Sequence, residues 1–248
     1  MKVLAVIPAR YASTRFPAKL LANKTGKYLI QHVYQQVCLA KRLDRVLIAA
    51  DDQRIGDACD SFGANWQMTR TDHQSGTDRI AEVASKIKAD IIVNVQGDEP
   101  EIDPTHIDLL IELMQNDPDA SMATLAAPID ATTNEGKADL VNPNVVKLVM
   151  GLDKRALYFS RSCIPFNRDK SETKGLYRRH LGIYAYRYDA LLKLSTLPQT
   201  ILEKTEKLEQ LRALENGMKI LVGDVDHPAV GIDTPEQYEE FVNRYQNK

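Results

Sequence analysis

The sequence is poor in cysteine and has no long apolar run. Its three cysteines are widely spaced, odd in number and without a CxxC pair, which excludes a disulfide framework and leaves buried small hydrophobic side chains as the expected role. No apolar stretch approaches the ~20 residues of a membrane helix. The apolar segment 3–9 is short for a signal-peptide core and has no cleavage site after it. We therefore expect a cytoplasmic protein without membrane insertion.

The chain also lacks an excess of either charge. Among 248 residues, 32 are basic and 34 acidic, so the formal net charge is −2. A general nucleic-acid binder is disfavoured, because such proteins usually carry a basic excess. Acidic residues are nevertheless missing before Asp44, so that the first 43 residues carry a net charge of +8 and the remainder −10. This asymmetry predicts two local functions in one chain, one in a basic N-terminal segment and one in a later acidic part.

Short apolar runs alternate with helical patterns along most of the chain. The runs at 2–8, 45–50 and 90–96 predict strands buried on both faces, and apolar residues at i, i+3, i+4 and i+7 follow them. This alternation indicates an α/β fold with a mainly parallel sheet covered on both sides. Residues 120–190 break the rhythm with extended pieces around a polar loop at 130–144, which predicts a sheet-rich insertion.

A basic loop follows the first predicted strand. Arg10, Arg15 and Lys19 are separated by small and hydroxyl-bearing residues. Ligands of open parallel sheets bind beyond the carboxyl ends of strands, where this loop lies. Guanidinium and ammonium groups there suit a polyphosphate, although the loop has neither a dinucleotide-binding nor a P-loop glycine motif. The alternative is a solvated basic loop.

Two aspartates are candidate metal ligands. Asp98 follows the strand at 90–96 and is expected to face the basic loop, where a carboxylate beside phosphates holds Mg²⁺. The alternative is that Gly97 and Asp98 form only a turn. Thr234 with Gln237 reads as a capping box of the last helix, so Asp233 is spare and is either a second metal ligand or a further cap.

Two further groups of polar residues remain open from the residues alone. Segment 72–79 opens a helix, whose free N–H groups suit a phosphate or a nucleobase edge, while a capping box of Ser75 with Asp78 is an equal alternative. Arg161, His180 and segment 206–212 are suited to an acidic, hydroxyl-rich substrate, although each taken singly favours a structural role.

Taken together, these segments resemble one enzyme family, the 3-deoxy-manno-octulosonate (Kdo) cytidylyltransferases, or CMP-Kdo synthetases. The matching segments run in order from residue 7 to 236: IPARYASTRFP, MTRTDHQSGTDR, VNVQGDEP, NPNVVK, ALYFSR, RHLGIYAYR, EKTEKLEQLR and GIDTPE. One segment departs from the family pattern R-[LF]-P-G-K-P-L, because Ala18 stands at the glycine and Leu20 at the second proline.

The resemblance implies a Rossmann-like nucleotidyltransferase sheet in a single domain, 1–248, whose insertion at about 120–190 binds sugar and joins a homodimer. It also implies transfer of CMP from CTP to Kdo, giving CMP-Kdo and pyrophosphate for lipopolysaccharide synthesis. By similarity Arg10, Arg15 and Lys19 hold the triphosphate, and Asp98 and Asp233 hold Mg²⁺ as the cofactor. These five residues are the predicted catalytic set. Gln74, Ser75 and Gly76 read the cytosine, and Asp98 also belongs to the CTP-binding residues. The sugar-binding residues are Gln96, Arg161, His180, Tyr184, Glu209 and Gln210.

In the transfer of CMP, a weakly acidic alcohol attacks a polyanion that repels it. Cations must therefore neutralise the phosphates and hold an in-line geometry. The sequence offers no obvious side-chain general base, and metal-assisted deprotonation is the hypothesis that follows. Three alternatives remain. They are a cytidylyltransferase for 8-amino-3,8-dideoxy-octulosonate or a sialic acid, a nucleotidyltransferase for another nucleoside triphosphate, and a nucleotide-sugar sensor without activity.

Overall fold

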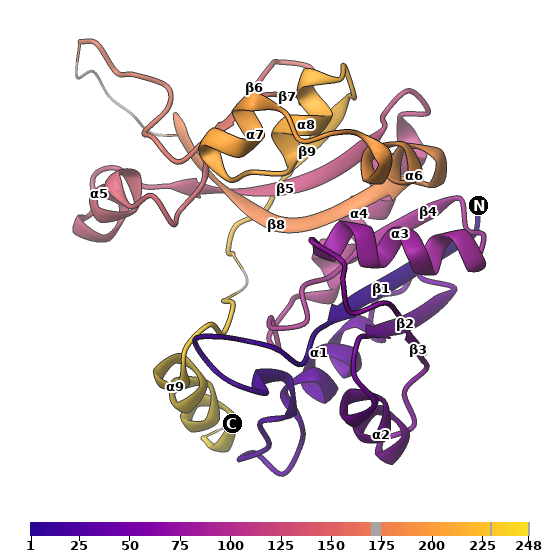
Figure 1. Cartoon of the computed structure of the whole chain (residues 1–248). Coiled ribbons are helices and arrows are strands. Elements are labelled where there is room, and N and C mark those ends of the chain that lie inside the picture. The colour runs from indigo at the N-terminus through magenta and orange to yellow at the C-terminus, as the bar shows by residue number, and fades with distance from the viewer. Residues whose placement is uncertain (170–174, 229, 248) are drawn as a thin grey trace. The chain divides into compact units, whose positions relative to one another are not determined.

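A computed structural model of the protein describes residues 1–169, 175–228 and 230–247 (Figure 1). The chain divides into two compact units. The first combines Met1–Ile111 with Ala229–Lys248, and the second is Glu112–Pro228. The predicted single domain with an insertion at about 120–190 stays a prediction. In the described ranges, no helix has both the length and the apolar character needed to cross a membrane.

The first unit is built on four parallel strands in the order β3-β2-β1-β4. Their bounds are β1 Val3–Ala9, β2 Arg45–Ala50, β3 Trp66–Met68 and β4 Ile91–Asn94. In β1, Val6 is in register with Leu47 of β2 on one side and with Asn94 of β4 on the other. All three predicted apolar runs therefore form strands, and the predicted parallel α/β sheet is confirmed.

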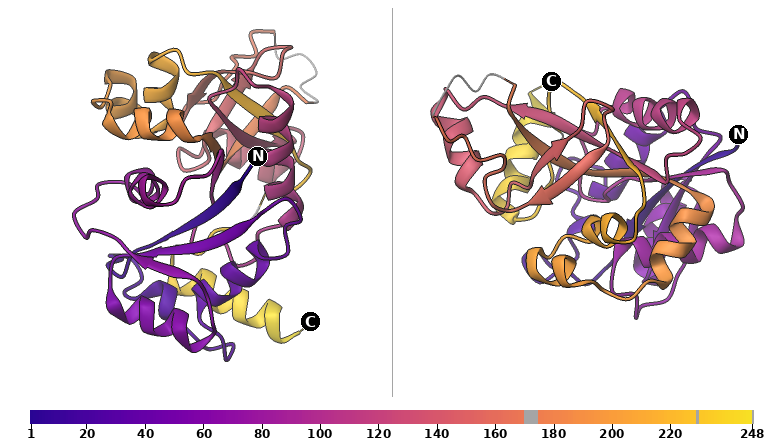
Figure 2. Two further views of the ribbon diagram at one scale, coloured as in Figure 1. Left: turned by 90° about the vertical axis from the view of Figure 1, so that its right-hand side faces the viewer. Right: turned by 90° about the horizontal axis from the view of Figure 1, so that it is seen from above.

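Helices cover both faces of this sheet because the connections between parallel strands are right-handed. From β1 to β2 to β3 the chain moves toward one edge of the sheet, and from β3 to β4 it crosses back to the other side of β1. Helix α3 therefore lies on the face opposite α1 and α2 (Figure 1). Helix α9 lies beside α1, as Figure 2 also shows. The helices are η1 Lys19–Leu21, α1 Leu29–Val37, α2 Gln53–Ser61, α3 Gly76–Lys86, α4 Pro104–Asn116 and α9 Pro235–Gln246.

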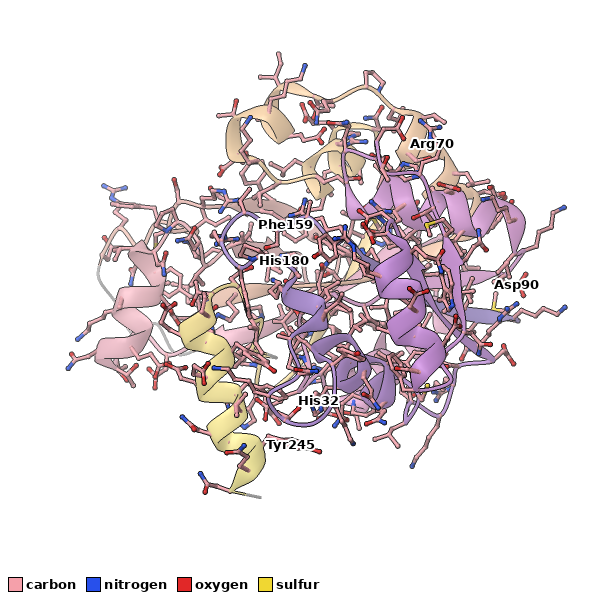
Figure 3. All side chains as sticks on the ribbon, turned by 60° about the horizontal axis from the view of Figure 1, so that its bottom comes forward. His32, Arg70, Asp90, Phe159, His180 and Tyr245 are labelled. Carbon is pink, nitrogen blue, oxygen red and sulfur yellow. The ribbon has the colours of Figure 1, made fainter. Side chains whose placement is uncertain are left out.

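His32 joins α1 to α9 within the first unit. Its ring packs edge-on against Phe241 and Tyr245, with centroid distances of 5.1 and 4.8 Å, and its Nε2 lies 2.7 Å from the Thr25 hydroxyl (Figure 3). Burial, assisted by the positive charge of Lys27, lowers the pKa of His32 to about 4. The unfolded chain therefore binds a proton near pH 6.5 that the folded unit takes up only near pH 4.

Acidification is expected to destabilise the first unit through His32. Because the unfolded state binds more protons between about pH 6.5 and pH 4, the free energy of unfolding falls as pH falls through this window, by about 2 kcal/mol from pH 7 to pH 5. His32→Gln removes the titration and is expected to flatten the pH dependence by that amount. Urea unfolding followed by fluorescence of the single tryptophan, Trp66, reports on the same unit. Equal slopes for both proteins would contradict the assignment.

The second unit is a mixed sheet. Its strand β5 (Met122–Ile129) pairs antiparallel with β8 (Tyr177–Arg187) and parallel with β9 (Ile220–Asp224). A hairpin of β6 (Lys147–Met150) and β7 (Ala156–Ser160) joins it, since β6 also pairs with β8. The unit's helices are α5 Asn134–Val141, α6 Tyr188–Thr196, α7 Ile201–Glu206 and α8 Gln210–Glu215. The sheet-rich character predicted for residues 120–190 is confirmed.

Two local predictions are wrong. The polar segment 130–144 contains helix α5, which Thr133 caps by accepting a hydrogen bond from the Gly136 N–H at 3.0 Å. This helix is mostly solvated and buries only Gly136 and Leu140, so its sequence carries little apolar periodicity. Of the cysteines, only Cys59 is buried, whereas Cys38 and Cys163 are exposed.

Candidate active site

A pocket of about 310 Å³ lies in the first unit, beyond the carboxyl ends of β1 and β4 and at the start of α3. Basic, acidic, hydroxyl and amide side chains converge on it from segments far apart in the sequence. Its lining residues are Pro8, Arg10, Ser13, Thr14, Arg15, Lys19, Leu20, His73, Gln74, Ser75, Gly76, Arg79, Gln96, Gly97, Asp98 and Asp233.

The ammonium group of Lys19 is the central charge of this pocket. Its Nζ lies 2.7 Å from Asp98 Oδ2 and 3.2 Å from Asp233 Oδ1, and it donates to the carbonyl of Ile232 at 2.5 Å. Asp233 is also paired with Arg15, whose Nη2 lies 3.2 Å from Oδ2. Lys19 is buried, so these electrostatic interactions are less screened than those of a surface pair.

Two backbone features bring the carboxylates of Asp98 and Asp233 together. A Cβ at Gly97 would lie 2.8 Å from the carbonyl oxygen of Pro8, so only glycine allows the end of β4 to approach the end of β1 this closely. The N–H of Ile232 then donates to the carbonyl of Asp98 at 2.9 Å. This bond brings Asp233, which follows Ile232, beside Asp98. The two residues are 135 positions apart in the sequence.

The loop that carries the basic residues is held by its own contacts within the unit. The N–H of Tyr11 donates to Asp51 Oδ1 at 2.8 Å, and Asp51 Oδ2 lies 3.2 Å from Nη2 of the buried Arg79. Phe16 packs against Tyr238 of α9, with ring centroids 5.6 Å apart. The loop is therefore anchored at both ends before any ligand binds.

Ala18 has a left-handed backbone conformation directly before Lys19. Its φ and ψ are 52° and 30°, a region that costs a residue with a Cβ about 1–2 kcal/mol. The conformation turns the chain into η1, where the N–H of Leu21 donates to the Ala18 carbonyl at 2.8 Å. The family pattern has glycine at this position, and the turn explains that preference. Leu20, at the family's proline position, is buried and lines the pocket.

Ala18→Gly is therefore expected to stabilise the protein. Relief of the left-handed strain outweighs the entropy that glycine loses on folding, and the net gain is about 0.5–1 kcal/mol. Urea unfolding followed by Trp66 fluorescence measures it. Ala12→Gly is the matched control, because Ala12 lies in the same loop without a positive φ and is expected to lose stability. A loss in both variants would refute the strain at Ala18.

The start of α3 closes one side of the pocket. Ser75 Oγ accepts from the Asp78 N–H, and the Asp78 carboxylate accepts from the Ser75 N–H, each at 3.1 Å. The capping box is thus present, and Ser75 still lines the pocket. In the chain segment that follows β4, burial and the neighbouring charge of Asp98 raise the pKa of Glu99 to about 8.

Comparison with known proteins agrees with this geometry. The family profile described as cytidylyltransferase matches residues 4–220. The chain belongs to the cytidylyltransferase family. It is 51% identical to the 3-deoxy-manno-octulosonate cytidylyltransferase of Solibacter usitatus (strain Ellin6076), over 96% of this chain and 92% of the relative. It is 47% identical to the enzyme of that name from Geobacter sulfurreducens, over 98% of this chain and 99% of the relative.

Solved structures lead to the same family. A structure of CMP:2-keto-3-deoxy-manno-octonic acid synthetase complexed with CTP aligns with a TM-score of 0.94 and 42% identity, covering all of this chain and 99% of that one. A cytidylyltransferase from Leptospira borgpetersenii, 18% identical with a TM-score of 0.65 over all of this chain and 88% of that one, shares the fold. The chain is accordingly an enzyme of the nucleotidyltransferase class, as the sequence motifs indicate.

The pocket unites every predicted site residue of the first unit. All line it, whether predicted for phosphate, metal, cytidine or sugar. They are Arg10, Arg15, Lys19, Gln74, Ser75, Gly76, Gln96, Asp98 and Asp233. Their placement is observed here, and their individual roles stay predictions. The five other predicted sugar-binding residues belong to the second unit.

Those five residues lie on three elements of the second unit. His180 and Tyr184 come from β8, with ring centroids 5.4 Å apart, and Arg161 follows β7. Glu209 and Gln210 stand at the start of α8. Burial, with the charges of Tyr186 and Glu209, holds the pKa of Tyr184 well above its usual range.

Several polar pocket residues carry no individual role in the sequence-based prediction. They are Ser13, Thr14, His73 and Arg79. Spacing offers a signal for three of them. Ser13 and Thr14 lie between the basic residues of the first loop, and Arg79 follows Ser75 by one helical turn on α3. The buried pair of Arg79 with Asp51 has no such signal, because it depends on the packing of α3 against the end of β2.

Proposed function

We propose that this cytidylyltransferase transfers CMP from CTP to 3-deoxy-manno-octulosonate, releasing pyrophosphate and giving CMP-Kdo for lipopolysaccharide synthesis. The observation that carries the proposal is the convergence of the three basic residues of the first loop with Asp98 and Asp233 in one pocket of a chain similar to enzymes of that name. Such a pocket neutralises a triphosphate and orients it for attack on the α-phosphorus. The sugar's 2-hydroxyl is the attacking group.

The first loop binds the triphosphate of the nucleotide, and the start of α3 binds its cytidine. Arg10, Arg15 and Lys19 bind the triphosphate through charge-assisted hydrogen bonds. Arg15 and Lys19 pair with the carboxylates of Asp233 and Asp98, which also line the pocket, so their side chains are oriented toward it. Cytidine lies against Gln74, Ser75 and Gly76, which line the pocket at the start of α3.

Asp98 and Asp233 suit a magnesium ion. Their oxygens already share one cation, the Lys19 ammonium, and carboxylate is the ligand type that Mg²⁺ prefers. No cluster of three or more acidic, histidine or cysteine ligands occurs in the described part of the chain, so substrate phosphates and water complete the coordination. When bound, the ion supplies neutralisation of phosphate charge. Chelation with EDTA is expected to abolish activity, and added Mg²⁺ to restore it.

The second unit holds the acceptor sugar. Gln210 Nε2 is buried and has no hydrogen-bond partner among the described residues, which suits a donor to a ligand oxygen. Three of the five N–H groups of Arg161 donate hydrogen bonds to the carbonyls of Pro143, Glu206 and Lys207. Its two remaining N–H groups, one on each terminal nitrogen, bind the sugar carboxylate.

Pyrophosphate release across a substrate panel tests the function. CTP with Kdo is expected to give the highest kcat/KM. 8-Amino-3,8-dideoxy-octulosonate, a sialic acid and other nucleoside triphosphates are expected to be poor. Preference for the amino sugar or the sialic acid would reassign the acceptor, and preference for another triphosphate would reassign the donor. Tight CTP binding with no pyrophosphate from any acceptor would support a sensor instead.

Assembly and compartment complete the proposal. The free cysteines of the described chain suit a reducing compartment, and the cytoplasm is our assignment. We expect a homodimer joined through residues 120–190. Light scattering after size exclusion decides this, because a single species at the monomer mass of 27.9 kDa would refute the dimer.

A further inference from the structure

A bulge in β8 allows the Thr124 hydroxyl to link two backbone carbonyls to the ring of His180 by hydrogen bonds. Thr124 of β5 is in register with Tyr184 of β8, but the next residue, Leu125, is in register with Leu181. Gly182 and Ile183 are therefore extra residues of β8. The bulge turns two backbone carbonyls toward the Thr124 hydroxyl, with Oγ1 lying 3.0 Å from Leu181 O and 2.9 Å from Ile183 O. Bulges of this kind redirect side chains beside functional sites.

The Thr124 hydroxyl has its proton committed to these carbonyls. Thr124 is fully buried, and a carbonyl oxygen only accepts hydrogen bonds. A hydroxyl has a single proton, so toward any third partner its oxygen acts as an acceptor. The third partner is Nε2 of His180, which lies 3.1 Å from the same Oγ1. Nε2 must therefore carry the proton and donate it to Thr124.

His180 is also neutral. Burial lowers its pKa to about 3, and its ring packs edge-on against Phe159, with centroids 5.1 Å apart (Figure 3). A neutral imidazole carries one proton on its two nitrogens. With that proton on Nε2, the lone pair is on Nδ1. A ligand group that binds Nδ1 must be a hydrogen-bond donor, which excludes a carboxylate and favours a hydroxyl.

We propose that Thr124 is a positioning residue that holds His180 in the Nε2–H tautomer, so that Nδ1 accepts a hydrogen bond from a hydroxyl group of the acceptor sugar. The inference deepens the proposed function and rests on it for the identity of the ligand. It gives His180 and Arg161 opposite tasks, because His180 selects a hydroxyl and Arg161 selects the carboxylate. Because the 2-hydroxyl is the attacking group, the two contacts together favour an acid that carries at least one further hydroxyl.

Nitrogen NMR of the histidine rings tests the tautomer without any substrate. Two-bond correlation spectra of protein labelled with ¹⁵N in its histidine rings, recorded near pH 7, are expected to show His180 protonated at Nε2. Thr124→Ser keeps the hydroxyl and is expected to keep this pattern, whereas Thr124→Val is expected to lose it. A proton on Nδ1 in the unmodified protein would overturn the proposal, and that measurement depends on no variant. An unchanged pattern in Thr124→Val would overturn the role of Thr124.

Steady-state kinetics tests the consequence for the sugar. Thr124→Val is expected to raise KM for Kdo about tenfold, with kcat and KM for CTP near their usual values, and Thr124→Ser is expected to restore KM. Thr196→Val is the matched control, because it removes an exposed hydroxyl that donates to the Lys193 carbonyl at 2.8 Å. An unchanged KM for Kdo in a folded Thr124→Val enzyme would overturn the hydroxyl contact. If the unmodified protein itself fails to use Kdo, the proposed function fails, while the NMR result still decides the tautomer.

Discussion

Replacing Asp98 by asparagine is expected to lower the rate of pyrophosphate release from CTP by about 10³-fold or more. The substitution keeps the shape of the side chain and removes one of the two carboxylates that converge on the Lys19 ammonium. The fold is expected to survive, because the backbone bond between Asp98 and Ile232 does not involve the side chain. Pyrophosphate release with CTP, Kdo and Mg²⁺ measures the effect, and circular dichroism checks the fold.

Asp90→Asn is the matched control for this variant. Asp90 stands directly before β4, as Asp98 stands beyond its other end, and the Asp90 carboxylate is exposed and accepts from the Lys2 N–H at 2.6 Å (Figure 3). The control is expected to keep its activity. Near-normal turnover in Asp98→Asn with Mg²⁺ present would show that Asp98 has no metal-binding role.

Lys19→Met is expected to impair both activity and stability. Loss of the ammonium removes a phosphate-binding cation, which we expect to cost about 10²–10³-fold in kcat/KM. It also leaves the Asp98 and Asp233 carboxylates and the Ile232 carbonyl without their shared donor. We expect the free energy of unfolding to fall by about 1–3 kcal/mol, because a partly buried acceptor that loses its partner keeps its desolvation cost.

The same variant reports on the cation site without any turnover. If Mg²⁺ binds where the ammonium lies, added Mg²⁺ is expected to raise the melting temperature of Lys19→Met more than that of the unmodified protein. Lys24→Met is the matched control, because Lys24 pairs with Glu239 on the surface of the same unit. Equal Mg²⁺ shifts in Lys19→Met and Lys24→Met would contradict a cation site between the two aspartates.

Local capping chemistry is the part of this site that the sequence predicts best. Thr234, Pro235 and Gln237 form the predicted capping box, and Asp233 is left to pair with Lys19 and Arg15. These features depend on neighbours within four residues, so sequence order alone reveals them. At Ser75 the structure shows the capping box that sequence could not separate from a binding role.

Features that depend on pairing between distant strands were not predictable. The contact of Thr124 with His180 exists because β8 bulges opposite β5, and neither Thr124 nor Gly182 stands out in a single sequence. The left-handed conformation of Ala18 was equally hidden, since an alanine gives no local sign of a positive φ. Only the glycine of the family pattern indicates it.

The return of α9 to the first unit has a consequence for how the enzyme is made. Asp233 and the ring contacts of His32 come from residues that follow the whole second unit in the chain. A nascent chain on the ribosome therefore has all the residues of its four-stranded parallel sheet long before it has those of a complete pocket. Lys19 meets both carboxylates only after the segment containing Asp233 has been synthesised, so chains abandoned within the second unit carry the basic loop and Asp98 without the second carboxylate.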